Sequence, residues 1–340
     1  MTEAAALAAM GWSAFFADQL DAAERADLQP LRVALVQRAR LTANSTAGPV
    51  RLSLPGALKT SDFAVGDWVL ADPQSHLLHR RLHRKTVIER QFDDDAPAQL
   101  IAANIDTLFI VTSCNSEFNP ARLERYLALA IEAETEPVVV LTKADTSADA
   151  GAFTAQARTL HRGLAVVALN ATSPEAAASL APWCGVGQTV ALIGSSGVGK
   201  STLLNTLAGP DQAASQNTGA IRAGDAKGRH TTTARSLHPI ASGGWVIDTP
   251  GMRSLQVCAA AAGLATLFAE ITELAPQCRF RNCTHAHEPG CAVRAAVAVG
   301  ALDPARLDRW RKLDAENRAN TPVQTGPRGN KSAMRRPGTH

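Results

Sequence analysis

The sequence predicts a multidomain fold that combines a small β-barrel, an α/β domain with a mostly parallel sheet, and a helical metal-binding domain. Three observations lead to this prediction. Short strands separated by turn residues occupy residues 31 to 88, and apolar strands alternate with helical stretches between residues 107 and 247. Three cysteines and two histidines lie between Cys278 and Cys291. At 340 residues with 46% hydrophobic content, the chain can bury the cores of two or more domains.

Composition excludes several classes of protein. No apolar run has the length needed to cross a bilayer, because even the stretch from Leu100 to Val111 is interrupted by Asn104 and Asp106. The first twenty residues lack the basic start and long apolar centre of a secretory signal. Six cysteines would make a sparse disulfide framework in a chain of this length. We therefore expect a cytoplasmic protein with no membrane partner.

Charge is unevenly distributed along the chain, although the net charge is only +3. Residues 31 to 90 hold ten Lys and Arg against four Asp and Glu, and residues 303 to 340 hold nine against four, so the centre is acidic. Basic ends around an acidic centre suggest a polyanionic partner such as a nucleic acid. The plainer alternative is that these cations only keep the surface soluble.

Residues 1 to 97 are predicted to form a helical extension followed by a barrel. Residues 1 to 30 carry apolar side chains at helical spacing, and Pro30 is expected to end the helix. The apolar residues are Trp12, Phe15, Phe16 and Leu20. Residues 31 to 97 contain short strands at close spacing, which with their basic charge favour an oligonucleotide-binding barrel, or OB-fold. The strands are expected at 31–41, 50–54, 65–71 and 77–88, and a linker at 92–97.

Residues 98 to 257 are predicted to form the α/β domain, because strand, helix and strand repeat in the manner of a parallel sheet with helices on both faces. The expected strands are 107–112, 138–142, 164–169, 189–193 and 245–247, with a helix at 121–132. Residues 258 to 320 show no strand pattern and are predicted to form helices at 260–274 and 305–318. The basic residues 321 to 340 are rich in Pro, Gly and Asn and are expected to be disordered.

Gly194 to Ser201 reads Gly-Ser-Ser-Gly-Val-Gly-Lys-Ser and matches the phosphate-loop pattern completely. It follows an apolar strand and precedes a helical pattern, as such loops do. The glycines let backbone N–H groups face phosphate oxygens, Lys200 is expected to reach the β- and γ-phosphates and act in catalysis, and Ser201 to ligate Mg²⁺. A chance match in a structural loop is the weaker alternative.

Thr142-Lys143-Ala144-Asp145 ends the strand at 138–142 and matches a guanine-recognition motif. A carboxylate at Asp145 can accept two protons from guanine, while the stem of Lys143 covers the base. Thr142 stands where Asn is usual, so one tether to the phosphate loop is expected to be altered. Asn170-Ala171 could offer a backbone N–H to the guanine O6, although a plain turn explains it equally well.

Asp248-Thr249-Pro250-Gly251 follows the strand at 245–247 and matches a γ-phosphate sensor. Asp248 is expected to hold Mg²⁺ and Gly251 to contact the γ-phosphate. The next residue is Met252, which cannot orient water, so we expect His230 to position or deprotonate water and Thr232 to ligate Mg²⁺. The alternatives are a mobile surface histidine and Mg²⁺ ligation by Thr233. The predicted nucleotide-binding set is Thr142, Lys143, Ala144, Asp145, Asn170, Ala171, Gly194, Ser195, Ser196, Gly197, Val198, Gly199, Lys200, Ser201, Thr202, Asp248 and Gly251.

Three thiols and one imidazole fall within fourteen residues, at Cys278, Cys283, His285 and Cys291. Such a set satisfies tetrahedral Zn²⁺ with no open position, so we expect one structural zinc ion. His287 is an alternative ligand. The other three cysteines, Cys114, Cys184 and Cys258, are expected to be packed thiols.

The motif order resembles that of the ribosome small-subunit-dependent GTPases of bacteria, a circularly permuted family. The base reader precedes the phosphate loop and the sensor comes last, whereas ordinary GTPases begin with the phosphate loop. Further likeness lies in Ala102-Ala103-Asn104-Ile105-Asp106, in Gly228-Arg229-His230-Thr231-Thr232-Thr233 and in the cysteine cluster.

The resemblance implies an OB-fold, a circularly permuted P-loop GTPase domain and a zinc domain that holds its ion through Cys278, Cys283, His285 and Cys291. It also implies a cytoplasmic GTPase that binds GTP with Mg²⁺, the small (30S) ribosomal subunit and 16S rRNA, and assists late maturation. Hydrolysis to GDP would be stimulated by the subunit and coupled to release through residues 252 to 258. We expect a monomer.

Two rival interpretations remain open from the sequence. The chain could be a nucleotide-gated RNA-binding module in which the bound state does the work and hydrolysis is incidental. It could also be an ATPase with another target, because the guanine motif is imperfect.

Overall fold

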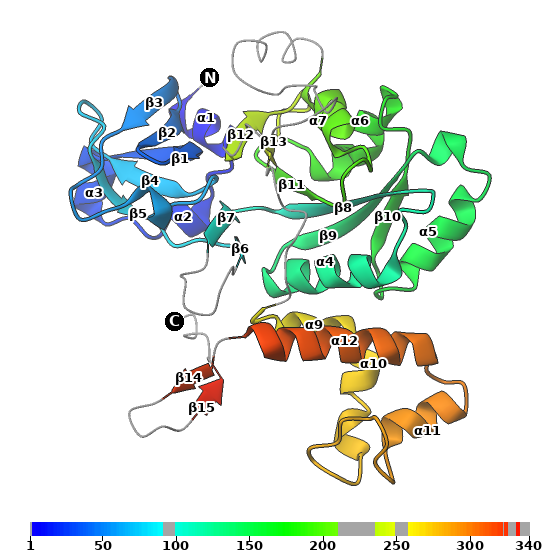
Figure 1. Cartoon of the computed structure of the whole chain (residues 1–340). Coiled ribbons are helices and arrows are strands. Elements are labelled where there is room, and N and C mark those ends of the chain that lie inside the picture. Colours follow the sequence, from blue (N-terminus) through cyan, green and yellow to red (C-terminus); the bar gives the residue numbers. More distant parts are fainter. Residues whose placement is uncertain are drawn as a thin grey trace. The chain divides into compact units, whose positions relative to one another are not determined.

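The computed structural model of this chain describes residues 2–90, 99–209, 235–248 and 258–321, and the backbone of 323–325 and 331–333 (Figure 1). The chain divides into two compact units. The first comprises Met1–Arg90, Ala98–Asn119 and Thr135–Ser254, and the second comprises Gln91–Pro97, Pro120–Glu134 and Leu255–His340. The first unit therefore contains both the barrel strands and the strands of the parallel sheet.

The N-terminal extension is three short helices: α1 (Glu3–Ala9), α2 (Ala14–Ala17) and α3 (Ala22–Asp27). Met10 and Phe16 pack against Trp68 on the outer face of the barrel, and the rings of Trp12 and Trp68 lie 4.8 Å apart. The prediction of a single helix was wrong, although the last of the three helices does end before Pro30, at Asp27. Pro30 lies in strand β1, opposite Leu70, because proline is tolerated near the start of a strand, where its missing N–H costs little.

The barrel strands close on themselves. They are β1 (Gln29–Gln37), β2 (Arg40–Ser45), β3 (Gly48–Leu52), β4 (Trp68–Ala71) and β5 (Leu78–Arg81), followed by the hairpin β6 (Val87–Arg90) and β7 (Gln99–Ala103). β1 pairs with both β2 and β4, and β5 pairs with β4. A parallel bridge between Ser53 and Leu77 joins the ends of the row. Alternating side chains such as Leu31, Val33 and Leu41 fill the interior.

A second set of strands forms the nucleotide-binding sheet, which is parallel except for one strand. The strands are β8 (Thr107–Ser113), β9 (Glu136–Thr142), β10 (Ala165–Ala168), β11 (Thr189–Ile193), β12 (Arg235–Pro239) and β13 (Trp245–Asp248). They lie in the order β10, β9, β8, β11, β13, β12. β12 is antiparallel to β13 and also pairs with β1 of the barrel, at Leu35 opposite Ser236. Neither β7 nor β12 was predicted from the sequence.

Helices cover the faces of this sheet. The helices of the first unit are α5 (Ala150–Arg158), α6 (Glu175–Leu180) and α7 (Lys200–Ala208). The apolar side chains of α6 and α7 pack with Phe109, Val138, Val190 and Val246, which share one face of the sheet. The connection from β9 through α5 leads to β10, at the edge of the sheet. The connection from β10 through α6 leads in the opposite direction, past β9 and β8, to β11. Right-handed crossovers therefore put α5 on the opposite face.

The second unit is helical. Its helices are α4 (Pro120–Glu132), α9 (Ala261–Leu267), α10 (Ala269–Thr272), α11 (Ala292–Ala298) and α12 (Pro304–Asn320). Gly263 of α9 lies so close to α4 that a Cβ atom there would stand 2.1 Å from the carbonyl oxygen of Ala128, so only glycine fits. The tail contains the paired strands β14 (Val323–Thr325) and β15 (Lys331–Ala333), which the sequence pattern did not predict.

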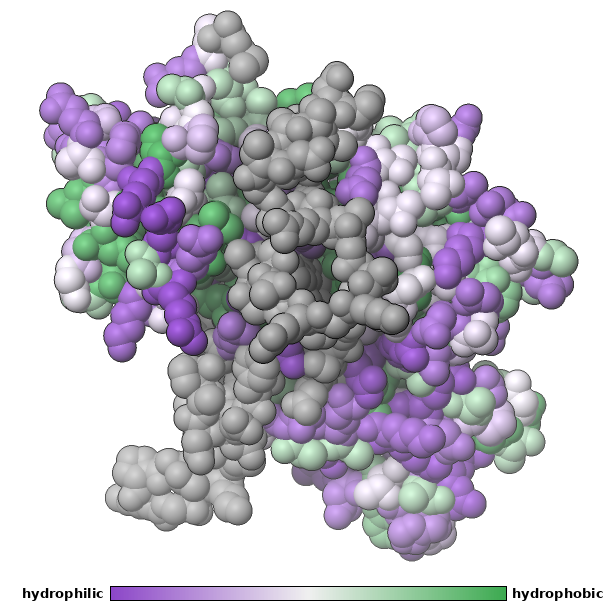
Figure 2. Space-filling model, turned by 45° about the horizontal axis from the view of Figure 1, so that its top comes forward, coloured by the Kyte–Doolittle hydropathy of each residue, from purple (hydrophilic) through white to green (hydrophobic). Residues whose placement is uncertain are grey.

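Within the residues that the structure describes, no helix is long and apolar enough to cross a membrane. On the face drawn in Figure 2, hydrophilic and hydrophobic residues are interspersed over the coloured part of the surface.

Candidate functional site

Four strands of the first unit end at the carboxyl edge of the parallel sheet. β9, β10, β11 and β13 all run in the same direction and end at Thr142, Ala168, Ile193 and Asp248. Ligands of open α/β sheets bind at this edge, where loops after neighbouring strands converge. The three predicted motifs follow three of these strands, so the fold gathers them although they are far apart in the sequence.

The loop from Gly194 to Gly199 adopts a backbone that needs its glycines. The φ angles of Gly194, Gly197 and Gly199 are 151°, 77° and 94°, values that side chains disfavour. A Cβ atom at Gly194 would stand 2.1 Å from the carbonyl oxygen of Val111. The loop leads from β11 directly into α7, which begins at Lys200 and carries Ser201 and Thr202 in its first turn. Ser195, Ser196 and Val198 complete the predicted phosphate loop.

Lys200 and Asp248 lie at the ends of neighbouring elements. The Lys200 ammonium donates hydrogen bonds to the carbonyl oxygens of Gly194 at 2.8 Å and Ser195 at 2.5 Å. Burial raises the pKa of the Asp248 carboxyl, and the positive charge of Lys200 partly opposes that rise. The Lys200 ammonium and the half-buried Asp248 carboxyl therefore lie close together beside the phosphate loop. A phosphate group with a bound metal ion would require such a pair of charges.

Thr142 and Lys143 tie the predicted base reader to the phosphate loop. The buried Thr142 hydroxyl lies 2.5 Å from the carbonyl oxygen of Val198 and 3.1 Å from that of Thr112. The Lys143 ammonium donates to the carbonyl oxygen of Gly197 at 3.0 Å, and Lys143 itself has a left-handed backbone with φ of 57°. Threonine at position 142 thus keeps a direct tether to the loop, although one hydroxyl proton must serve two acceptors.

Asp145 meets the loop that follows β10. The Asn170 side-chain amide donates a hydrogen bond to Asp145 Oδ2 at 3.1 Å, and the backbone N–H of Ala144 donates to the carbonyl oxygen of Leu169 at 3.3 Å. The sequence suggested only a backbone role for Asn170 and Ala171. Proximity of Asp145 and Asn170 follows from the pairing of β9 with β10, which sets Leu141 beside Ala168.

Three predicted residues lie outside the described residues. They are His230, Thr232 and Gly251, together with most of the predicted coupling segment 252 to 258.

The cysteine and histidine cluster of the second unit is assembled as predicted. One ligand atom from each of Cys278, Cys283, His285 and Cys291 lies within 4.8 Å of the others. Among the separations, His285 Nδ1 stands 3.4 Å from Cys291 Sγ and 3.5 Å from Cys278 Sγ. Arg311 of α12 donates to the His285 carbonyl oxygen, and the His285 and Trp310 rings lie 5.4 Å apart. Three sulfurs and one nitrogen at these separations can hold a tetrahedral metal ion.

One buried charge that was missed from the sequence lies in strand β1. Arg32 of β1 is 1% exposed and donates to the carbonyl oxygen of Met10 at 2.5 Å and to the Thr189 hydroxyl at 2.7 Å. Burial lowers the pKa of Arg32 to about 10, an effect that the negative charge of Asp106 offsets in part. Because Thr189 begins β11, this arginine joins the N-terminal helices and the barrel to the strand that carries the phosphate loop.

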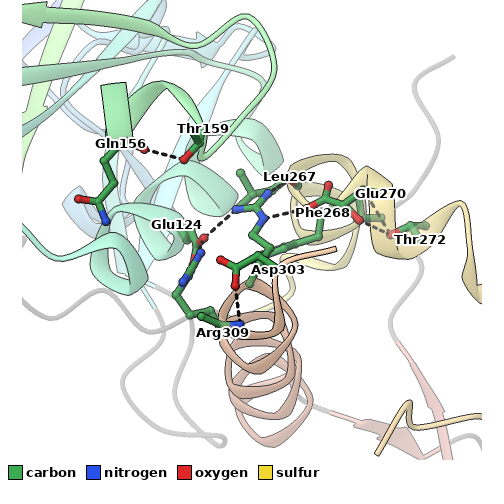
Figure 3. Close-up of polar contacts among 12 residues, drawn as sticks. Glu124, Gln156, Thr159, Leu267, Phe268, Glu270, Thr272, Asp303 and Arg309 are labelled. Atoms are coloured by element: carbon green, nitrogen blue, oxygen red, sulfur yellow. Dashed lines mark hydrogen bonds and ion pairs between the residues drawn. The ribbon is translucent and has the colours of Figure 1, made fainter. Parts of the chain in front are cut away.

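Another missed site is a network centred on Glu124 of α4 in the second unit (Figure 3). Its fully buried carboxylate accepts from Arg306 Nη1 at 2.7 Å and from Arg309 Nε at 2.8 Å. Arg306 also donates to Glu270 at 2.8 Å, and its guanidinium lies over the ring of Phe268. The network joins α4, α10 and α12 into one body.

The chain is similar to known proteins over most of its length. The family model described as RsgA GTPase matches residues 81–258. The chain is 66% identical over 326 residues to the Small ribosomal subunit biogenesis GTPase RsgA of Mesorhizobium japonicum, covering 96% of this chain and 94% of the relative. It is 47% identical over 315 residues to the Small ribosomal subunit biogenesis GTPase RsgA 2 of Vibrio vulnificus, covering 92% and 88%.

Two solved structures are also similar. The crystal structure of YjeQ from Thermotoga maritima has a TM-score of 0.63 and 25% identity, covering 85% of this chain and 98% of that one. The structure of YloQ, described as a circularly permuted GTPase, has a TM-score of 0.59 and 22% identity, covering 87% and 97%. The likeness to YloQ supports the circularly permuted fold.

Proposed function

Because this chain belongs to the RsgA GTPase family, we propose that it hydrolyses GTP on the small ribosomal subunit, assists that subunit's late maturation and leaves after hydrolysis. The observation that carries the proposal is the pair of hydrogen bonds from Thr142 to Val198 and from Lys143 to Gly197. They join a base-reading loop to a phosphate-binding loop at one edge of a sheet. One nucleotide can therefore contact both.

The roles of the site residues follow from this proposal. Asp145 accepts hydrogen bonds from guanine and the Lys143 stem covers the base, while backbone N–H groups of the loop from Gly194 to Gly199 bind phosphate oxygens. Lys200 turns from the loop carbonyls to the β- and γ-phosphates. Ser201, Thr232 and Asp248 are the proposed ligands of Mg²⁺, which neutralises charge developing on the phosphates. His230 is proposed to position water, and Gly251 to contact the γ-phosphate.

The flanking parts are proposed to hold the subunit. The five-stranded barrel has the basic composition of an oligonucleotide-binding fold and is proposed to contact 16S rRNA. The cluster of Cys278, Cys283, His285 and Cys291 is proposed to hold one structural Zn²⁺, because its donor set leaves no open position for catalysis. We propose a cytoplasmic monomer with domains at residues 31–97, 98–257 and 258–320, flanked by the N-terminal helices and a basic tail.

Turnover of GTP with purified ribosomal subunits tests the proposal. Small subunits should accelerate phosphate release strongly, whereas large subunits at the same concentration should not. Excess ATP should fail to displace labelled GTP. Equal acceleration by both subunits would remove the ribosomal assignment, and displacement by ATP would favour the rival ATPase.

The Ser201→Ala variant separates hydrolysis from binding. If hydrolysis is required, this variant should bind small subunits but should neither turn over GTP nor support maturation in cells. Complete maturation without turnover would instead favour the nucleotide-gated RNA-binding module.

A further inference from the structure

The Asn170 side chain links two parts of the base-reading end of the site. Its Oδ1 accepts from the Thr172 backbone N–H at 3.0 Å and from the Thr172 hydroxyl at 2.7 Å. Its Nδ2 donates to Asp145 Oδ2 at 3.1 Å. The amide therefore has both ends engaged, one in its own turn and one on the carboxylate that is proposed to read guanine.

The chemistry of these partners fixes which way the amide points. Thr172 presents a backbone donor, so it needs the oxygen of the Asn170 amide. The Asp145 carboxylate accepts only, so it needs the nitrogen. A flipped amide would set two donors face to face at Thr172 and two acceptors face to face at Asp145. The Asn170 donor is thus directed at Asp145 by its own turn.

The backbone that carries Asn170 is anchored on both sides. The Thr206 hydroxyl of α7 donates to the carbonyl oxygen of Ala171 at 2.7 Å, and the Ala171 side chain is buried in the core under α6 and α7. On the other side, the Ala144 N–H reaches the carbonyl oxygen of Leu169. Asn170 therefore stands on a fixed frame between the base-reading loop and the helix of the phosphate loop.

We propose that Asn170 is a positioning residue for base selection, which holds the plane of the Asp145 carboxylate so that both oxygens can accept from guanine. An ionised carboxylate has about four lone-pair sites. The Asn170 donor occupies one on Oδ2, which leaves the second site there and both on Oδ1 for guanine N1–H and the exocyclic 2-amino group. This inference rests on the proposed function, because it assigns Asp145 to guanine.

The test compares GTP with inosine triphosphate, which lacks the 2-amino group and so cannot make the second bond to Asp145. Affinities are measured by equilibrium competition in excess Mg²⁺. Loss of the Asn170 donor should weaken the binding of GTP about tenfold and that of inosine triphosphate about threefold or less. GTP loses more because its two hydrogen bonds to Asp145 both require a fixed carboxylate plane, whereas inosine triphosphate makes only one. The ratio of the two affinities should therefore fall at least about threefold.

Two variants and one control separate positioning from general damage. Asn170→Ala removes the donor and the turn contact together. Asn170→Asp keeps the oxygen for Thr172 but sets a second carboxylate against Asp145, so it should lower GTP affinity and the GTP preference at least as much while preserving the turn. Ser173→Ala removes a contact in the same turn, from the Glu175 N–H at 3.3 Å to the Ser173 hydroxyl, and should leave the ratio unchanged.

The outcomes distinguish a failure of the positioning role of Asn170 from a failure of the proposed GTPase function. If wild-type protein binds GTP and both Asn170 variants keep the wild-type ratio of affinities, the positioning role is wrong and the proposed function stands. If the wild-type protein does not prefer GTP to ATP, the proposed function fails and the inference fails with it. A ratio that falls in both Asn170 variants and not in Ser173→Ala supports the role, and thermal unfolding without nucleotide checks that each variant is folded.

Discussion

Replacing Glu124 by Ala should loosen the helical unit far more than replacing any exposed acid on the same helices. The wild-type carboxylate is fully buried, and Arg306, which is 9% exposed, would lose its partner at Nη1. Breaking a buried ion pair by removing one member costs about 3–5 kcal/mol. Arg306 keeps Glu270 and the ring of Phe268, and Arg309, at 22% exposure, can turn toward water. We therefore expect the lower end, about 3 kcal/mol.

Hydrogen exchange of the α12 backbone amides measures how much the loss of Glu124 lowers the free energy of local opening in the helical unit. A local opening free energy reduced by about 3 kcal/mol should speed exchange by about two orders of magnitude. The matched control is Glu316→Ala, because Glu316 pairs with Arg125 at 2.5 Å across the same two helices while the side chains are 24% and 35% exposed. That pair should be worth less than about 1 kcal/mol, so exchange should rise less than about fivefold.

Equal exchange rates in the two variants would refute the reasoning, because burial would then make no difference between the two ion pairs. So would an acceleration in Glu124→Ala that is confined to α4 and does not reach α12, because Glu124 would then not hold the helices together.

Three other perturbations test separate contacts. Thr142→Val leaves the Val198 carbonyl without its donor and should weaken GTP binding by about 1–3 kcal/mol, as measured by calorimetric titration. Thr142→Ser keeps the hydroxyl and should leave the affinity unchanged. Unchanged affinity in the Val variant would contradict the tether. Because burial raises the pKa of Asp248, its charged form opposes folding at neutral pH, so Asp248→Asn should raise the unfolding temperature of nucleotide-free protein at pH 7. That gain should shrink as the pH falls toward the ordinary value of 3.8, where the wild-type carboxyl is protonated, and a gain that grows there would reverse the sign. Chelation of the metal, or Cys283→Ser, should change the fluorescence of Trp310 beside the cluster without changing GTP affinity, and an unaltered spectrum would argue against a structural metal.

The sequence located the strand ends of the site because each motif follows a short apolar run. The order of the motifs also predicted the permuted topology. A parallel sheet brings such strand ends to one edge whatever their order along the chain. The sequence alone therefore predicts that Thr142, Gly194 and Asp248 lie together, as the strand pairing shows. The metal cluster was equally accessible, because all four ligands lie within fourteen residues.

The buried charges could not be found in the same way. Alternation along β1 correctly sets Arg32 on the outer face of the barrel, between the inward Leu31 and Val33, but that face is covered by the N-terminal helices and not by water. Glu124 falls among the buried residues of α4, and its partners lie 182 and 185 residues further along the chain. Local pattern carries no signal for partners so distant.

Through the antiparallel strand β12, the barrel is hydrogen-bonded to the end of β13 that carries Asp248. Leu35 of β1, Ser236 of β12 and Asp248 of β13 lie in one row across three neighbouring strands. Rows of this kind are held by hydrogen bonds between main-chain groups, so the connection does not depend on which side chains stand in it. A force on the barrel would therefore reach Asp248 through the main-chain hydrogen bonds that join β1, β12 and β13.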